Sequence, residues 1–158
     1  MGPAVIIANM EPLFAWLHFM AMLALGSTLA AELVLCTTSL RADQITALLR
    51  VDSLYLLATV AVLATGLARL IWFAKGPGFY LSNPSFQIKI GLFIAIGLLS
   101  LPPTRHYVRW RRAARDGRGD PPPAEIARVH RYLVAELVLL AAMPLMASLM
   151  ARGIAVWN

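Results

Sequence analysis

The chain has 158 residues, of which 59% are hydrophobic, and its formal net charge is +6. The mean hydropathy of +0.70 is well above that of an ordinary soluble domain. A chain of this length predicts one domain, residues 1–158, and excludes a two-domain enzyme. The single cysteine, Cys36, excludes an internal disulfide.

Four long apolar segments predict four membrane-spanning helices, at about 12–36, 53–73, 84–104 and 127–150. A helix needs about 20 residues to cross the hydrocarbon core, and each segment reaches that length. Because the connections between the segments are short, neighbouring helices are expected to run antiparallel. The predicted fold is therefore all-α, an integral membrane antiparallel four-helix bundle.

Turn and cap residues mark the expected helix ends. Asp52 or Ser53 is expected to cap the second helix. The sequence Lys75-Gly-Pro-Gly78 predicts a tight turn before the third helix. Pro102-Pro103 is expected to close that helix, and Pro144 is expected to kink the fourth. Tyr107 and Trp110 are expected at the membrane interface.

Arginine is concentrated in one part of the chain. Eight arginines lie in a stretch of 27 residues: Arg105, Arg109, Arg111, Arg112, Arg115, Arg118, Arg128 and Arg131. Such a cluster could bind nucleic acid, but short Arg-rich loops are retained in the cytoplasm, and this rule accounts for the cluster more simply. We therefore predict no nucleic-acid partner, a cytoplasmic loop at 105–126, and both termini outside the bacterial inner membrane. The lipid bilayer is the expected partner, with contacts from this loop to anionic headgroups.

Ionisable residues interrupt the apolar segments. A charge in the hydrocarbon core costs roughly 2.5–3.5 kcal/mol on insertion scales, which makes these residues the best candidates for function. At 1.5 Å of rise per residue, His18, Arg69 and Lys89 fall at a similar depth near the outer face, and Met146 and Met150 reach the same level. His18 is a candidate metal ligand for the iron of haem b, with Met146 or Met150 as a second ligand. Arg69 and Lys89 could then pair with the haem propionates.

The alternative for this outer layer is structural. His18 could form a hydrogen bond to a neighbouring carbonyl, while Arg69 and Lys89 extend their charged ends toward water.

A second polar layer is predicted toward the cytoplasmic side. Glu32, Tyr55 and Glu136 are candidate catalytic residues because they resemble parts of a proton relay. Alternatively, the two glutamates could neutralise arginines at the membrane surface, namely Arg105, Arg128 or Arg131. His106 and His130 flank this layer, where they are either solvated or ligands of a second haem.

Helical spacing predicts that both layers face one interior. Residues three or four apart form one stripe on each of the first three helices: His18, Met22, Leu25, Leu29 and Glu32; then Tyr55, Thr59, Val62, Gly66 and Arg69; then Lys89, Phe93, Ile96 and Ser100.

Four motifs resemble the bacterial membrane family called domain of unknown function 2214. They are Lys75-Gly-Pro-Gly-Phe-Tyr80, Asn83-Pro-Ser-Phe-Gln-Ile-Lys89, Gly97-Leu-Leu-Ser-Leu-Pro-Pro-Thr104 and Met150-Ala-Arg-Gly153. The resemblance extends over nearly the whole chain, and it implies a membrane protein without implying an activity.

A weaker resemblance is to the HemJ-type protoporphyrinogen oxidases, small four-helix membrane proteins that bind haem b. It is carried by Trp16-Leu-His18, by Arg69, and by Phe86-Gln-Ile-Lys89. The resemblance implies His18 as a haem ligand, with Arg69 and Lys89 nearby. The long Arg-rich loop departs from that family's pattern.

Together these observations predict a haem b-binding membrane protein in electron transfer or porphyrinogen oxidation. If the protein is an enzyme, the weaker resemblance implies a HemJ-like oxidoreductase. A porphyrin or quinone is then an expected partner, and a homodimer is compatible with so small a bundle. Two rivals remain: a cofactor-free accessory or assembly subunit of a larger membrane complex, and a small transporter or metal-handling protein.

Overall fold

The structure, a computed structural model, describes residues 3–73 and 84–151. Four α-helices make up most of this part of the chain: α1 (Pro3–Leu35), α2 (Ala42–Ala68), α4 (Pro84–Arg115) and α5 (Pro123–Ala151). A π-helical segment, η1 (Arg69–Phe73), continues α2. The turn predicted at 75–78 lies outside the described residues.

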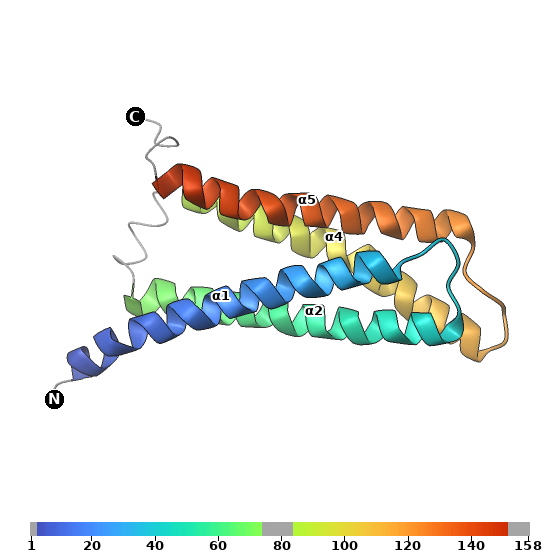
Figure 1. The fold of residues 1–158 in the computed structure, drawn as a ribbon, viewed down its shortest axis with the longest axis horizontal. Helices are drawn as coiled ribbons and strands as arrows, with labels where there is room; N and C mark the ends of the chain where they lie inside the picture. The colour runs from blue at the N-terminus through green and yellow to red at the C-terminus, as the bar shows by residue number, and fades with distance from the viewer. Residues whose placement is uncertain (1–2, 74–83, 152–158) are drawn as a thin grey trace.

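The helices form two antiparallel hairpins. Helix α1 packs closely against α2, and α4 packs closely against α5, whereas contacts between the two pairs are fewer. The start of α1 and the end of α5 lie at the same end of the molecule (Figure 1). The loops at 36–41 and 116–122 lie at the other end, which is called the Arg-rich end below. The expected all-α antiparallel four-helix bundle is thereby confirmed.

Helix α2 begins eleven residues earlier than the sequence predicted, at Ala42 rather than at 53. Arg41 has an extended backbone and takes the N-cap position, and its N–H donates to Oε1 of Gln44. Ile45 and Leu48 lie at helical spacing and are buried, so packing favours a helix in a stretch that lies before the predicted one. The prediction of Asp52 as a cap was wrong, because Asp52 lies inside α2 and is buried.

Helix α4 continues through Pro102-Pro103 to Arg115, so the predicted end of this helix at 104 was wrong. The two prolines remove two backbone donors, which normally disfavours a helix. Here the next three turns bury Tyr107 and Trp110 in the core, at 0% and 3% exposure. That burial opposes the cost of the prolines. It also shortens the loop predicted at 105–126 to the residues between α4 and α5.

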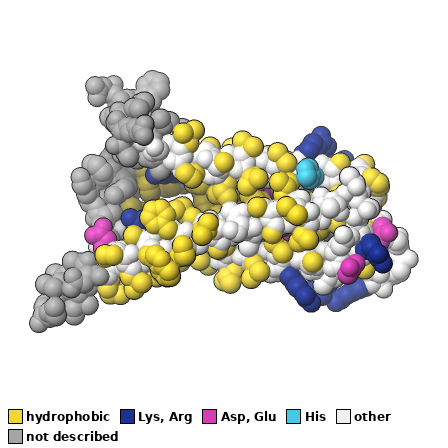
Figure 2. Space-filling model, viewed as in Figure 1, with side chains coloured by type: hydrophobic (Ala, Val, Ile, Leu, Met, Phe, Trp, Pro, Cys, Tyr) yellow, Lys and Arg dark blue, Asp and Glu magenta, His cyan; other side chains and the backbone are white. Residues whose placement is uncertain are grey.

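The surface of the bundle is suited to lipid. Three helices in the described residues are long and apolar enough to cross a membrane, at Met10–Leu35, Ala42–Trp72 and Phe86–Arg115. Large apolar side chains are exposed on them, among them Phe19, Leu57 and Leu98. Figure 2 shows these hydrophobic side chains along the bundle, with Lys and Arg gathered mainly at the Arg-rich end. The crossing predicted at 127–150 and the kink at Pro144, which lies inside α5, stay predictions.

Candidate functional site

The predicted interior stripes meet in the core. Leu25 and Leu29 of α1 are buried, as are Val62 of α2 and Ile96 of α4. These residues separate two polar regions, as the sequence predicted. One region surrounds Glu32 and Glu136 toward the Arg-rich end, and the other surrounds His18 toward the opposite end.

Three carboxyl groups lie buried in the first region. Glu32 of α1 is 2% exposed, Asp52 of α2 is 8% exposed and Glu136 of α5 is 1% exposed. Asp52 and Glu136 both act electrostatically on Glu32, which places the three in one neighbourhood. We call these three residues the carboxyl cluster.

Each carboxyl group accepts a hydrogen bond from a hydroxyl group. The Tyr55 hydroxyl donates to Oε2 of Glu136 at 3.1 Å, and the Tyr107 hydroxyl donates to Oε2 of Glu32 at 3.3 Å. The Thr104 hydroxyl donates to Oδ1 of Asp52 at 2.7 Å. All three bonds join a helix of the α1–α2 hairpin to a helix of the α4–α5 hairpin, so this polar region lies where the two hairpins meet.

The ion pairs that the sequence suggested for Glu32 and Glu136 are not formed. In the part of the chain that the structure describes, the ion pairs involve Glu125 and Asp116 instead. Oε1 of Glu32 and Oε1 of Glu136 are buried without a hydrogen-bond partner. The cluster is thus held by hydroxyl groups and not by basic side chains.

The second polar region contains His18, whose ring contacts the Thr65 hydroxyl of α2. Nδ1 of His18 lies 2.8 Å from Oγ1 of Thr65. The Thr65 hydroxyl has one hydrogen, which it donates to the carbonyl of Ala61 at 2.6 Å. We therefore assign Oγ1 as the acceptor and Nδ1 as the ring atom that carries a hydrogen. In the neutral ring the lone pair then lies on Nε2, the state in which an imidazole binds a metal through Nε2.

A glycine lies close to the His18 ring, and two basic residues lie within electrostatic range of it. A Cβ atom added at Gly66 would lie 3.3 Å from Cε1 of His18, so the glycine leaves room for the ring. Arg69 of η1 and Lys89 of α4 both act electrostatically on His18, and both are partly buried. Arg69 and Lys89 therefore lie within electrostatic range of His18 of α1, while the depth of the three residues in the membrane stays a prediction.

The packing between the hairpins is open at this end. No described residue of α4 before Ile96 is buried, and none of α5 after Glu136. The two hairpins also diverge toward this end (Figure 1). Met146 and Met150 lie in this part of α5, but their side chains lie outside those described. The described residues contain no group of three or more His, Cys, Asp and Glu that could hold a metal ion.

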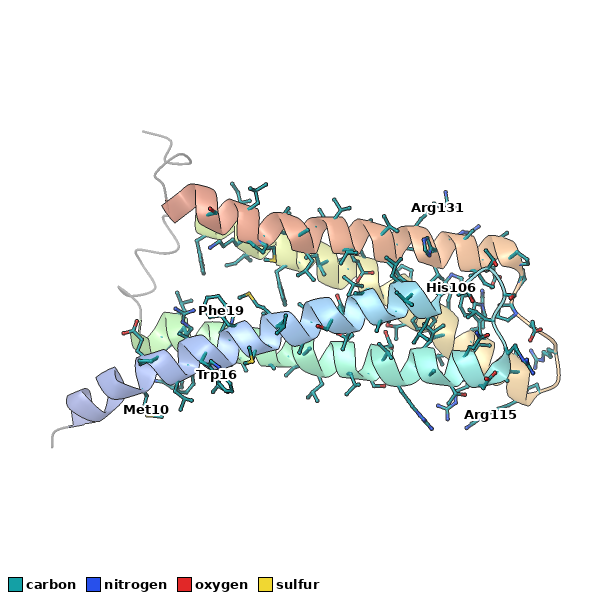
Figure 3. All side chains as sticks on the ribbon, viewed as in Figure 1. Met10, Trp16, Phe19, His106, Arg115 and Arg131 are labelled. Atoms are coloured by element: carbon teal, nitrogen blue, oxygen red, sulfur yellow. The ribbon has the colours of Figure 1, made fainter. Side chains whose placement is uncertain are left out.

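A polar contact joins α4 to α5 at the Arg-rich end. Glu125 accepts hydrogen bonds from Nε1 of Trp110, at 2.9 Å, and from Arg109. The Trp110 indole, and then the Arg109 guanidinium, hold the pKa of Glu125 below its ordinary value. His106 lies 2.9 Å from Arg109, whereas His130 is exposed. Figure 3 places His106, Arg115 and Arg131 toward this end, and Met10, Trp16 and Phe19 toward the other.

Tyr107 and Trp110, which the sequence predicted at the membrane interface, both have their side chains in the core of the bundle. Tyr107 bonds to Glu32 and Trp110 bonds to Glu125, so each ring has a polar partner inside the bundle. Their phenol and indole groups can be buried because these partners satisfy them.

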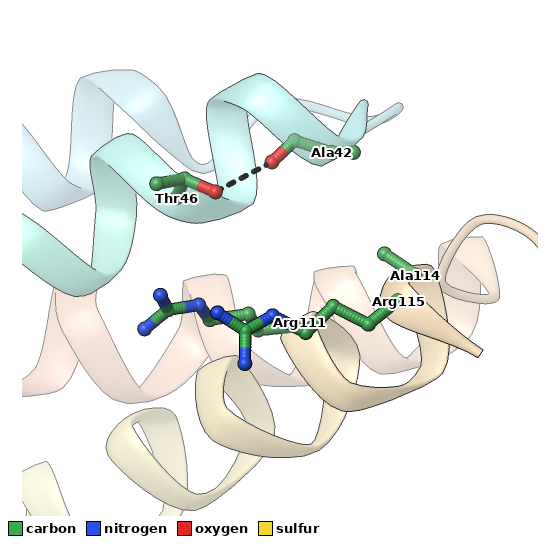
Figure 4. A pocket seen from close by; sticks show the side chains of 5 residues that line it. All are labelled: Ala42, Thr46, Arg111, Ala114 and Arg115. Carbon is green, nitrogen blue, oxygen red and sulfur yellow. Dashed lines mark hydrogen bonds between the residues drawn. The ribbon is translucent and has the colours of Figure 1, made fainter. Parts of the chain in front are cut away.

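A shallow basic pocket lies between the start of α2 and the end of α4. It is lined by Ala42, Thr46, Arg111, Ala114 and Arg115. Figure 4 shows the two arginine side chains beside the first turn of α2, where the Thr46 hydroxyl donates to the Ala42 carbonyl at 2.9 Å. Cys36 lies near this end and is also buried.

Sequence reasoning missed three members of the first region, Asp52, Thr104 and Tyr107. Each continues a predicted stripe by one or two turns: Asp52 precedes Tyr55 by three residues, and Thr104 and Tyr107 follow Ser100 by four and seven. Asp52 and Tyr107 lie beyond the predicted helix bounds of 53 and 104, whereas Thr104 lies within them, where a lone threonine is not conspicuous. Thr65, which orients His18, could not be predicted from the sequence either, because it lies beside the helical stripe that contains Gly66 and Arg69 and is not part of it.

The fold and the site define a class: an integral membrane helical bundle with buried carboxyl groups and a half-buried histidine between α1 and α2. The chain matches the family model described as "Predicted membrane protein (DUF2214)" over residues 10–155, and it belongs to that family. No curated protein and no solved structure gives a significant match. The family description supplies the membrane location and no activity.

Proposed function

We propose that the protein binds haem b between its two hairpins, at the end opposite the Arg-rich end, and acts in electron transfer or porphyrinogen oxidation. His18 is the proposed axial ligand. The observation that carries the proposal is the 2.8 Å contact between Nδ1 of His18 and the Thr65 hydroxyl. With that hydroxyl donating to Ala61, we assign the hydrogen to Nδ1, and Nε2 keeps the lone pair. Metal-binding histidines commonly donate their other N–H in this way, which fixes both ring orientation and tautomer.

The surroundings of His18 fit the chemistry of haem. Haem b carries two propionates, and the two basic residues nearby, Arg69 and Lys89, offer two cationic partners. Half-buried apolar side chains at this end, among them Phe93 of α4 and Leu140 of α5, would supply apolar contacts to a planar macrocycle. When bound, haem b supplies one-electron chemistry at iron, while the protein sets the ligand, the access of water and the local charge.

The same basic residues suit a porphyrinogen substrate, which carries carboxylates of the same kind as haem. Arg69 and Lys89 would then orient that substrate rather than take part in its oxidation. Replacing Lys89 with alanine should raise the KM for porphyrinogen more than it lowers kcat. The gain of porphyrin fluorescence measures both constants.

The first experiment is an absorbance spectrum of the detergent-purified protein, oxidised and then reduced with dithionite. We expect a Soret band and sharpened bands on reduction in the wild-type protein, and their loss in His18→Ala. His130→Ala is the matched control, because His130 is exposed and lies on another helix. An unchanged Soret band in His18→Ala would exclude His18 as ligand.

A featureless spectrum that persists after haemin is added would contradict haem binding altogether. That outcome would favour the rival function, an accessory subunit of a larger membrane complex. Copurification of a partner in equal amount would then support the rival.

A further inference from the structure

The carboxyl cluster is the strongest feature that haem binding does not use. Its three members come from three helices and lie in the core with three hydroxyl groups around them. No basic side chain forms an ion pair with any of the three in the described part of the chain. Three ionised carboxylates in such a place would repel one another and would lack the water that normally stabilises them.

The three carboxyl groups differ in how strongly their surroundings stabilise the ionised form. Asp52 accepts the shortest bond, at 2.7 Å from the Thr104 hydroxyl, and is the most exposed of the three. The bonds to Glu136 and Glu32 are longer, at 3.1 and 3.3 Å. Each glutamate also keeps one oxygen that is buried without a partner. A buried oxygen of this kind needs a hydrogen or a water molecule.

We propose that Glu32 and Glu136, with Asp52 beside them, form a proton-binding site inside the bundle. The site holds a proton at neutral pH and exchanges it with water through Asp52 at the Arg-rich end. On loading, a proton passes from hydronium to a carboxylate oxygen, leaving water and a neutral carboxylic acid. The ligand is thus the proton itself, and the site is separate from the His18 region.

A bound metal ion fits the cluster less well. Three carboxylates that share one ion must place their oxygens around a common point, as in calcium sites. The described residues contain no such arrangement of His, Cys, Asp and Glu. A proton needs only one oxygen at a time, so the spread of the three groups is compatible with it.

The pH response of the site depends on every titratable group that faces it. These groups are Glu32 and Cys36 from α1, Asp52 and Tyr55 from α2, Tyr107 from α4 and Glu136 from α5. All of them are neutral or negative, so no cation competes with the proton inside the cluster.

Dicyclohexylcarbodiimide tests the proposal, because it dissolves in apolar surroundings and reacts with protonated carboxyl groups. The acidic proton moves to a nitrogen of the reagent and the carboxylate oxygen adds to its central carbon, so no atom is lost. The full-length protein in lipid vesicles is treated and its peptides are mapped by mass spectrometry. We expect adducts on Glu32 or Glu136 at neutral pH, at least about tenfold above those on the partly exposed Glu125 of the same chain.

The pH dependence identifies the bound proton. For one titrating group, the adduct should fall about tenfold per pH unit above its midpoint. Tyr55→Phe removes a donor to the charged form of Glu136, so labelling of Glu136 should persist to higher pH. A water-soluble carbodiimide at mildly acidic pH, as the control reagent, should reverse the preference, because it reaches the partly exposed Glu125 and not the buried glutamates.

Three results would overturn the proposal. One is the absence of adducts on Glu32 and Glu136 in the folded wild-type protein at mildly acidic and neutral pH. The second is labelling that does not change with pH. The third is protection by sodium at constant pH, which would assign the cluster to a cation instead. None of these readouts depends on a variant that might fail to fold, and none depends on haem.

Discussion

At the scale of single residues, the geometry around His18 depends on one hydroxyl group. Thr65 accepts the Nδ1 hydrogen and so decides which ring nitrogen is available. Thr65→Val keeps the shape of the side chain but removes the acceptor. We expect the affinity for haemin to fall about tenfold to a hundredfold, the usual cost of losing such a partner. A titration of haemin followed at the Soret band measures the change.

Thr65→Ser is the control for this prediction, because it keeps the hydroxyl and loses a methyl group. Its affinity for haemin should stay close to that of the wild type. Equal affinities in the valine and serine variants would contradict the role of the hydrogen bond.

Gly66 gives a second prediction at this scale. A Cβ atom at Gly66 would lie 3.3 Å from the His18 ring, so Gly66→Ala should displace the ring by a few tenths of an ångström and weaken haemin binding. Gly26→Ala is the matched control, since its Cβ would meet Leu140 at an ordinary 3.8 Å. Alanine in a helix is favoured over glycine by about 0.5–1 kcal/mol, so Gly26→Ala should raise the thermal stability in detergent. Stronger haemin binding in Gly66→Ala would contradict the predicted crowding.

Several interior residues could be predicted from the sequence, because a charge in an apolar helix is conspicuous without any structure. His18, Glu32 and Glu136 were found in this way, and their faces followed from helical spacing. The residues that form hydrogen bonds with them could not be predicted from the sequence. Thr65 and Tyr107 are ordinary residues for a membrane helix, and only the packing of two helices shows which hydroxyl meets which acceptor.

At the scale of elements, prolines and polar residues misled the prediction of helix ends. A proline pair is a reliable stop signal only when nothing beyond it can be buried. In α4 the helix continues because Tyr107 and Trp110 lie beyond the pair and complete the core. The start of α2 was missed for a related reason, since Ile45 and Leu48 bury one face of an otherwise polar turn.

The contact between Glu125 and Trp110, which joins α4 to α5 at the Arg-rich end, should depend on pH. The pKa of Glu125 lies below the ordinary value of 4.5, so its stabilising contacts are complete above that pH and are lost as the pH falls through the lower, folded value. Acidification should therefore loosen the Trp110 contact. In a variant that keeps Trp110 as its only tryptophan, the fluorescence emission should shift with acid.

Glu125→Gln is the control for the acid response. Glutamine does not titrate, so the emission of Trp110 should no longer change over that range. The same shift in both proteins would mean that another group controls the contact.

At the scale of the whole molecule, the charge distribution predicts orientation. The Arg-rich end is expected in the cytoplasm. Cys36→Ala removes the only native thiol, and Arg118→Cys then places one thiol in an exposed loop. A membrane-impermeant maleimide should label it in inverted vesicles and not in intact cells. Met10→Cys, near the start of α1, should give the opposite pattern, and a reversal of both would invert the topology.

The hydrogen bonds that cross between the hairpins have a consequence for biogenesis. During translation the α1–α2 hairpin enters the bilayer first, carrying Glu32 and Asp52 before their partners Tyr107 and Thr104 exist. In lipid the hydrophobic effect does not drive helices together, so the carboxyl groups that still lack hydrogen-bond partners favour association with the later hairpin. They also select its register, because a shifted docking would leave carboxyl groups facing hydrocarbon. The order of synthesis thus makes docking of the two hairpins the last step of folding. The carboxyl groups that we assign to proton binding gain their hydrogen-bond partners only when that step is complete.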